Sequence, residues 1–185
     1  DTGFTAIYTA YATSIRCVIP EHKVDLEKLI QLLLHDKRSN PSNYALVVLS
    51  EGATWDGYAV QERGEPDAYG HRRKASVAEV LADEIRRRTG EETITSDLTY
   101  DLRSGDPDFT DKLVALTFGN MAYDAILDGK SGLMSALVDG CYDLMPIPDP
   151  KLGPRRVDVV SMYITERYRP SYAHKRGLPI FLSQR

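Results

Sequence analysis

Arg103 is the residue whose type and setting most suggest chemistry with a phosphate group. It stands four positions before Pro107, which opens a segment with helical spacing. The start of a helix presents backbone N–H groups that attract anions, and a guanidinium offers a planar set of donors that matches a phosphate. These features are consistent with a sugar-phosphate site. Equally, Arg103 could cap the turn through Asp106 or Asp108.

Glu21 and a basic run are two further candidates for contact with a polar ligand. Glu21 directly follows a proline at the end of an expected strand. Its carboxylate could accept hydrogen bonds from sugar hydroxyls, or it could be a solvated turn residue. The run of basic residues at 71–74 could attract an anionic ligand. A charged run before a helix is, however, usually a solvent-exposed segment with no binding role.

The motifs of several large enzyme classes are absent. No G-x-G-x-x-G follows a strand, so a nicotinamide or flavin enzyme has no support, and no G-x-S-x-G indicates a serine hydrolase. Gly129-Lys130-Ser131 resembles the end of a phosphate-binding loop, but Asp124 stands where that motif needs its first glycine. No two of the four histidines stand at metal-ligand spacing, so no metal site is expected in this chain.

The apolar residues alternate between helical and strand spacing along most of the chain. This pattern predicts, in order, a helix at 6–13, a strand at 17–19, a helix at 25–39, a strand at 44–49, a long loop to 74, a helix at 77–89, a strand at 92–98, a helix at 107–129 and a strand near 135–138. Such alternation indicates right-handed crossovers. We therefore predict a three-layer α/β fold with a mostly parallel sheet and helices on both faces.

The predicted sheet brings the candidate residues to its carboxyl edge. Ligands of such sheets bind where the strands end, which selects Pro20-Glu21, Glu51-Gly52 and residues 100–105. Each place carries charge or hydrogen-bonding capacity that a purely structural turn would not need.

Composition argues against some classes of partner. The 185 residues carry 23 Lys and Arg against 27 Asp and Glu, a net charge of −4, so the clustered positive charge of a nucleic-acid binder is missing. No apolar run reaches the ~20 residues that span a bilayer, so no membrane association is expected. Cys17 and Cys141 stand far apart, which favours inert thiols in a cytoplasmic, reducing compartment. Asp1 in place of a methionine suggests a fragment of a longer chain.

Three stretches resemble the carboxyl-terminal half of a 6-phosphofructokinase. They are Gly3-Phe4-Thr5 leading to the I-P-E at 19–21, the run V-V-L-S-E-G-A at 47–53, and residues 100–107 with Asp111-Lys112 beyond. In that family the I-P-E glutamate and the four residues ending in the R-S-G arginine bind fructose 6-phosphate. The resemblance implies the same role here for Glu21, Tyr100, Asp101, Leu102 and Arg103. It also implies a substrate-binding domain over residues 1–154, followed by a peripheral helix and an irregular tail over 155–185.

The resemblance further implies a division of the chemistry between two halves of an enzyme. The family's glycine-rich donor loop and its T-x-D-x-D catalytic segment belong to the amino-terminal half, so no catalytic residue is assigned in this chain. ATP or pyrophosphate, together with Mg²⁺, would bind mainly through that half. The complete protein would be a cytoplasmic, allosteric homo-oligomer of glycolysis.

Two departures from the short bacterial enzymes keep other interpretations open. Those enzymes have histidine at the position of Tyr100, and tyrosine there resembles the longer branches, some of which use pyrophosphate. They also have an arginine that reaches a neighbouring subunit's sugar phosphate at the position of Ile94. The first function that the resemblance implies is transfer of a phosphoryl group from ATP to the 1-hydroxyl of fructose 6-phosphate, although no residue of this chain separates ATP from pyrophosphate as the donor. A pyrophosphate-dependent enzyme and a noncatalytic sugar-phosphate-binding regulatory module are the alternatives.

Overall fold

The structure is a computed structural model that describes residues 2–58, 62–63, 73–98 and 101–172. These residues form two compact units. The first comprises the described residues up to Asp97 and those from Pro154 to Tyr172, and the second runs from Leu98 to Gly153. The chain therefore leaves the first unit, builds the second, and then completes the first. Residues 154–172 are called the return segment below.

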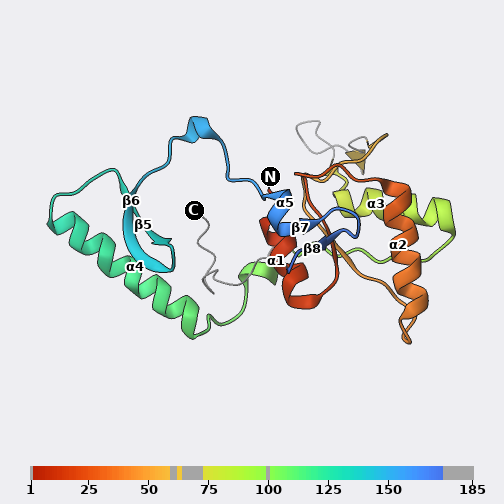
Figure 1. The fold of residues 1–185 in the computed structure, drawn as a ribbon, viewed down its shortest axis with the longest axis horizontal. Coiled ribbons are helices and arrows are strands. Elements are labelled where there is room, and N and C mark those ends of the chain that lie inside the picture. Colours follow the sequence, from red (N-terminus) through yellow and green to blue (C-terminus); the bar gives the residue numbers. More distant parts are fainter. Residues whose placement is uncertain (1, 59–61, 64–72, 99–100, 173–185) are drawn as a thin grey trace. The chain divides into compact units, whose positions relative to one another are not determined.

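The first unit combines helices with one parallel pair of strands and two short antiparallel pairs. Its elements are α1 (Phe4–Thr13), β1 (Arg16–Val18), α2 (Leu26–Ser39), β2 (Val47–Leu49), β3 (Glu62–Arg63), β4 (Arg73–Lys74), α3 (Val77–Thr89), α5 (Val159–Met162), β7 (Tyr163–Ile164) and β8 (Arg169–Pro170) (Figure 1). β1 and β2 are parallel with Val18 opposite Leu49, so both strands end at the same edge. Within the described residues, the parallel pairing that the sequence predicts is limited to this pair and an isolated parallel bridge between Val24 and Trp55. The pairs β3–β4 and β7–β8 are antiparallel.

The helices α2 and α3 begin and end where local capping residues place their boundaries. The side chain of Asp25 accepts a hydrogen bond from the backbone of Lys28 and starts α2. Ser76 and Glu79 form a reciprocal capping box at the start of α3, and Gly90 ends that helix with a φ of 73°. A left-handed backbone is easiest for glycine, which has no Cβ. Both helices therefore confirm the sequence prediction.

The hydrophobic core of the first unit draws on both of its chain segments. Val157, Met162, Tyr163 and Tyr168 of the return segment are buried with side chains from α1, β1, α2 and α3. The sequence predicts only a peripheral helix and an irregular tail from residue 155 onward, whereas the described part of that stretch is a short helix and a hairpin that fill the core. Its partners lie far away in the sequence, which local spacing does not reveal. The functional boundary at residue 154 stays a prediction.

The segment at 92–98 is not the strand that the sequence predicts. Residues 90–98 form no strand, and Ile94 is 93% exposed. The hydroxyl of Thr93 accepts a hydrogen bond from the guanidinium of Arg86 at 2.9 Å and donates to the carbonyl oxygen of Ala82 at 3.4 Å. These contacts hold the segment against α3, and no neighbouring strand pairs with it in the described part of the chain.

The second unit consists of a long helix and a hairpin. Its elements are η1 (Asp101–Arg103), α4 (Phe109–Leu127), β5 (Leu133–Val138), β6 (Cys141–Pro146) and η2 (Pro150–Leu152). Asp108 and Asp111 cap the start of α4 reciprocally, two residues after the predicted boundary. β5 and β6 are antiparallel, and the turn between them places Asp139 and Gly140 at positive φ, as a tight hairpin requires.

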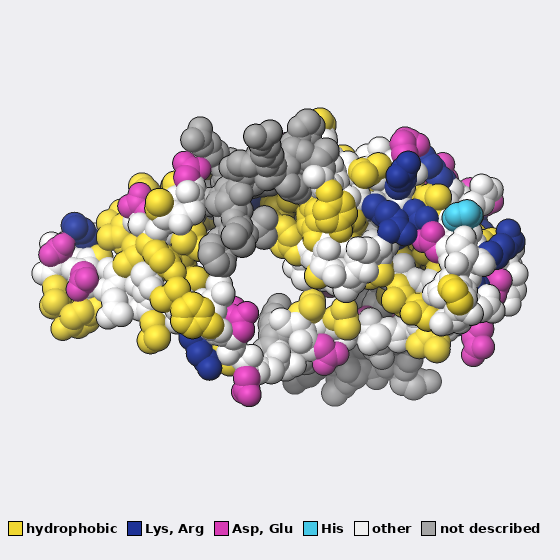
Figure 2. Space-filling view, turned by 60° about the horizontal axis from the view of Figure 1, so that its bottom comes forward, with side chains coloured by type: hydrophobic (Ala, Val, Ile, Leu, Met, Phe, Trp, Pro, Cys, Tyr) yellow, Lys and Arg dark blue, Asp and Glu magenta, His cyan; other side chains and the backbone are white. Residues whose placement is uncertain are grey.

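Helix α4 exposes hydrophobic side chains along most of its length, and only its Ala125 is buried. The large exposed ones are Phe109, Leu113, Leu116, Tyr123, Ile126 and Leu127. Figure 2 shows hydrophobic side chains gathered over this unit, in the left part of the view. A helix that is apolar all round is typical of a buried position in a larger protein. Among the described residues, no helix combines the length and hydropathy needed to cross a membrane.

Candidate functional site

Glu21 lies in the turn that follows β1, at the carboxyl edge of the parallel pair. Its half-buried carboxylate accepts hydrogen bonds from two backbone N–H groups. The nitrogen of Gly3 lies 3.1 Å from both Oε1 and Oε2, and the nitrogen of Val157 lies 3.1 Å from Oε1. Gly3 is the N-cap of α1, so the negative charge also complements that helix terminus. Glu21 thereby joins the strand end, the start of α1 and the return segment.

Position 3 needs a glycine because there is no room for a side chain, and not because of its backbone conformation. A Cβ on Gly3 would lie 2.5 Å from the Cβ of Ile19 and 2.7 Å from Oε2 of Glu21, well inside the ~3.5 Å at which carbon atoms meet. Its φ of −84° is open to any residue. The close approach of the Gly3 backbone to the strand end is therefore what brings its N–H to the carboxylate.

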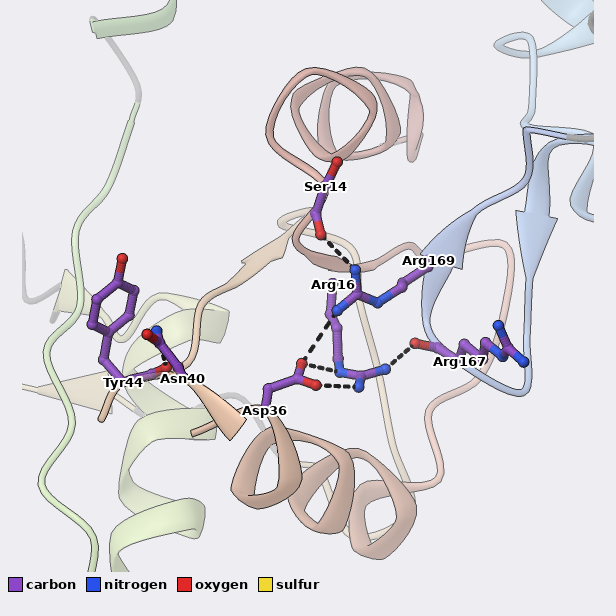
Figure 3. Close-up of polar contacts among 7 residues, drawn as sticks. All are labelled: Ser14, Arg16, Asp36, Asn40, Tyr44, Arg167 and Arg169. Carbon is purple, nitrogen blue, oxygen red and sulfur yellow. Dashed lines mark hydrogen bonds and ion pairs between the residues drawn. The ribbon is translucent and has the colours of Figure 1, made fainter. Parts of the chain in front are cut away.

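A buried ion pair supports the strand that leads to Glu21. The Nε and Nη2 of Arg16 donate to the two carboxylate oxygens of Asp36 on α2, at 2.6 and 2.7 Å (Figure 3). A third donor, Nη1, reaches the carbonyl oxygen of Arg167 at 2.5 Å. Arg169 adds a weaker contact to Asp36 at 3.5 Å. These bonds connect β1, α2 and the β7–β8 hairpin, so they fix the start of the strand whose far end carries Glu21.

The neighbouring strand end carries a hydroxyl that sequence analysis missed. Ser50 directly follows β2, and its N–H donates to the carbonyl oxygen of Val18 at 2.9 Å. Its Oγ is buried and has no hydrogen-bond partner among the described residues. A buried hydroxyl left unsatisfied costs about 1–3 kcal/mol, which makes Ser50 a candidate for contact with a ligand at this edge. The sequence could have indicated Ser50 through its position at the end of a strand, one residue before Glu51, which the sequence analysis places at the ligand-binding edge.

The other predicted site residues belong to the second unit. Asp101 and Leu102 are exposed in η1, and the backbone of Arg103 ends that turn. Tyr100 and the side chain of Arg103 lie outside what the structure describes. Glu21 is part of the first unit and η1 part of the second, and each is described within its own unit. Their shared role in binding a sugar phosphate stays a prediction.

The remaining candidates have structural explanations or lie partly outside the described residues. The triplet Gly129-Lys130-Ser131 follows the end of α4, as predicted. The N–H of Lys130 donates to the carbonyl oxygen of Ala125 at 2.9 Å, and Gly129 has a φ of 69°. Of the basic run at 71–74, only the backbone at 73–74 is described, as β4. In the described parts of the chain, no three His, Cys, Asp or Glu side chains gather as a metal-binding group.

The two cysteines differ in their surroundings. Burial raises the pKa of the Cys17 thiol to about 12, so Cys17 is protonated and inert at neutral pH, as predicted. Cys141 is exposed on β6, so burial does not protect its thiol as it does that of Cys17.

The fold is that of a phosphofructokinase. The chain superimposes on a pyrophosphate-dependent phosphofructokinase from Marinobacter aquaeolei with a TM-score of 0.62 and 18% identity, over 87% of this chain and 38% of that one. The corresponding enzyme from Nitrosospira multiformis gives a TM-score of 0.59 and 19% identity, over 78% and 35% of the two chains. These likenesses confirm the predicted α/β class.

The sequence shows the same relationship. A family model described as Phosphofructokinase matches residues 1–126, and the chain belongs to this family. It is 31% identical over 94% of its length to a pyrophosphate–fructose 6-phosphate 1-phosphotransferase from Thermoproteus tenax, and 34% identical over 73% to one from Amycolatopsis methanolica. It is also 30% identical over 80% to ATP-dependent 6-phosphofructokinase 3 from Streptomyces coelicolor. The matches cover 49%, 40% and 44% of these relatives, so the chain spans less than half of each.

Proposed function

We propose that this chain is the fructose 6-phosphate-binding half of a phosphofructokinase, a phosphotransferase acting on the 1-hydroxyl of that sugar. The observation that carries the proposal is the setting of Glu21. Its carboxylate is half-buried at the carboxyl edge of a parallel pair and is held by two backbone N–H groups. The family resemblance assigns sugar binding to this same carboxylate, and ligands of α/β sheets bind at this edge.

The proposed division of labour follows from the physics of phosphoryl transfer. That reaction depends on positioning and on neutralising the charge of the phosphates. Glu21 would orient the sugar by accepting a hydrogen bond from it, and the guanidinium of Arg103 would bind the 6-phosphate with Tyr100, Asp101 and Leu102 beside it. We propose that the donor site, the aspartate base and the Mg²⁺ ligands lie in the part of the enzyme that this chain does not span. The exposed hydrophobic surface of α4 supports such a larger protein.

Two phosphoryl donors are candidates. ATP is the first donor that the family resemblance implies, and the Streptomyces coelicolor relative is named as ATP-dependent. The relatives from Thermoproteus tenax and Amycolatopsis methanolica are named as pyrophosphate-dependent, which favours pyrophosphate as the second candidate. An assay of the complete enzyme with each donor decides between them. A cytoplasmic location, allosteric control and a homo-oligomeric state remain proposals that rest on the family.

The first test replaces Glu21 with glutamine in the complete enzyme. We expect the Michaelis constant for fructose 6-phosphate to rise about tenfold, since a hydrogen bond to a charged group contributes ~1.5–3 kcal/mol and the amide keeps one acceptor oxygen. The Michaelis constant for the donor should stay unchanged. Glu166→Gln is the matched control, because Glu166 is an exposed glutamate paired with Lys28. Equal losses for both substrates would contradict a direct contact with the sugar.

The second test replaces Arg103 with lysine. Lysine keeps the positive charge but loses the planar set of donors, so we expect weaker binding of fructose 6-phosphate with little change in thermal stability. The measurements are the Michaelis constant for the sugar phosphate and the melting temperature. Arg87→Lys on α3 is the control, since Arg87 is exposed and pairs only with a nearby glutamate on its own helix in the described residues. An unchanged Michaelis constant in Arg103→Lys would assign Arg103 to the turn alone.

A further inference from the structure

The hydrogen bonds to Glu21 leave its carboxylate with little free acceptor capacity. A carboxylate offers about four lone-pair positions, two on each oxygen. Oε1 accepts from both Gly3 and Val157, and Oε2 shares the N–H of Gly3. One position therefore remains, and it is on Oε2.

We propose that the backbone amides of Gly3 and Val157 are positioning groups that restrict Glu21 to one sugar hydroxyl, accepted at Oε2. This inference rests on the proposed function, because it takes the sugar phosphate as the ligand of Glu21. It adds two contributors to which the family resemblance assigns no role. Both act through the main chain, so their side chains give no sign of the role.

Orientation of the carboxylate before the sugar arrives favours binding. A glutamate side chain that is free in solution loses rotamer freedom when a ligand fixes it. Here two N–H groups already fix the plane of the carboxylate on folding. The sugar hydroxyl then meets an acceptor that needs no reorientation.

The Val157 amide is itself held firmly in place by the return segment. The valine side chain is buried in the core. Further along the segment, the carbonyl oxygen of Ser171 accepts a hydrogen bond from the Tyr11 hydroxyl at 2.6 Å, and that of Tyr168 accepts from the N–H of Cys17 at 2.8 Å. Movement of the Val157 amide would displace its buried side chain from the core. The return segment is therefore part of the sugar site and not a peripheral addition.

The experiment removes single N–H groups without changing a side chain. Incorporating the α-hydroxy analogue of valine at position 157 of the complete enzyme turns the amide into an ester. We expect the Michaelis constant for fructose 6-phosphate to rise about fivefold or more, with kcat and the donor's Michaelis constant unchanged. The matched control is the same ester at Val160, whose N–H also donates to a carboxylate oxygen at 3.1 Å, that of Asp158.

A second variant and a double variant complete the test. The α-hydroxy analogue of glycine at position 3 removes the other N–H and should likewise raise only the Michaelis constant for fructose 6-phosphate. This variant tests the positioning role if the ester at 157 impairs folding. In the Glu21→Gln background, the ester at 157 should weaken sugar binding by less than it does alone, since the two changes act on one carboxylate.

The possible results separate this inference from the proposed function. If Glu21→Gln weakens sugar binding but neither ester does, the positioning role is overturned and the proposed function stands. An equal effect of the esters at 157 and 160 would also overturn it, because the loss would then be a general effect of the ester. If Glu21→Gln itself leaves sugar binding unchanged, the proposed function fails.

Discussion

Replacing Arg16 with methionine should lower the free energy of unfolding of the first unit by about 3–5 kcal/mol. The side chain of Arg16 is only 6% exposed and that of Asp36 is 23% exposed. The variant therefore leaves a largely buried carboxylate with only the weaker 3.5 Å contact to Arg169. The carbonyl oxygen of Arg167 loses a donor at the same time. Urea denaturation followed by the fluorescence of Trp55 measures this loss, because Trp55 is the single tryptophan and is buried in the first unit.

Arg87→Met provides the comparison for that measurement. Arg87 pairs with Glu84 on the surface of α3, where its side chain is 66% exposed. Exposed ion pairs contribute at most ~1 kcal/mol, so this variant should unfold at nearly the original urea concentration. A loss in Arg16→Met no larger than that in Arg87→Met would contradict the supporting role assigned to the Arg16–Asp36 pair.

The purified 185-residue chain should show no transfer of a phosphoryl group with either ATP or pyrophosphate. Positioning of donor and acceptor can lower the barrier by ~7–11 kcal/mol, and a chain that binds only the acceptor gains none of this. A coupled assay with each donor measures turnover. Titration with fructose 6-phosphate by calorimetry, on the same sample, reports whether the acceptor still binds.

The positive control for that assay is the full-length relative from Thermoproteus tenax, which is named as a pyrophosphate–fructose 6-phosphate 1-phosphotransferase. Turnover by the 185-residue chain above the background, with either donor, would mean that it contains a donor site. The proposed division of labour between the two halves would then be wrong.

Elements whose boundaries depend on neighbouring residues could be predicted from the sequence. The side chain of Asp25 caps α2, and the Ser76–Glu79 pair and Gly90 bound α3, all through contacts within a few residues. The position of Glu21 was also predictable, because alternating strands and helices place strand ends at one edge.

Features that depend on distant residues could not be predicted in this way. Val157 lies 136 residues from the carboxylate of Glu21 that it binds, and the hydroxyl of Tyr163 donates to the carbonyl oxygen of Cys17 across 146 residues. The segment at 92–98 has the residue types of a strand, but its Thr93 bonds to α3. Strand formation needs a partner strand, and one sequence read locally does not show which partner is present.

The interrupted path of the chain through the first unit also determines when that unit can be completed on the ribosome. Val157, Met162, Tyr163 and Tyr168 all belong to its core, and all of them follow the second unit in the sequence. At a synthesis rate of about 5–20 residues per second, residues 98–153 occupy several seconds between the two parts. During that interval α1, β1 and α2 have emerged without the aromatic residues that cover them. The core of the first unit therefore stays incomplete until the β7–β8 hairpin leaves the exit tunnel.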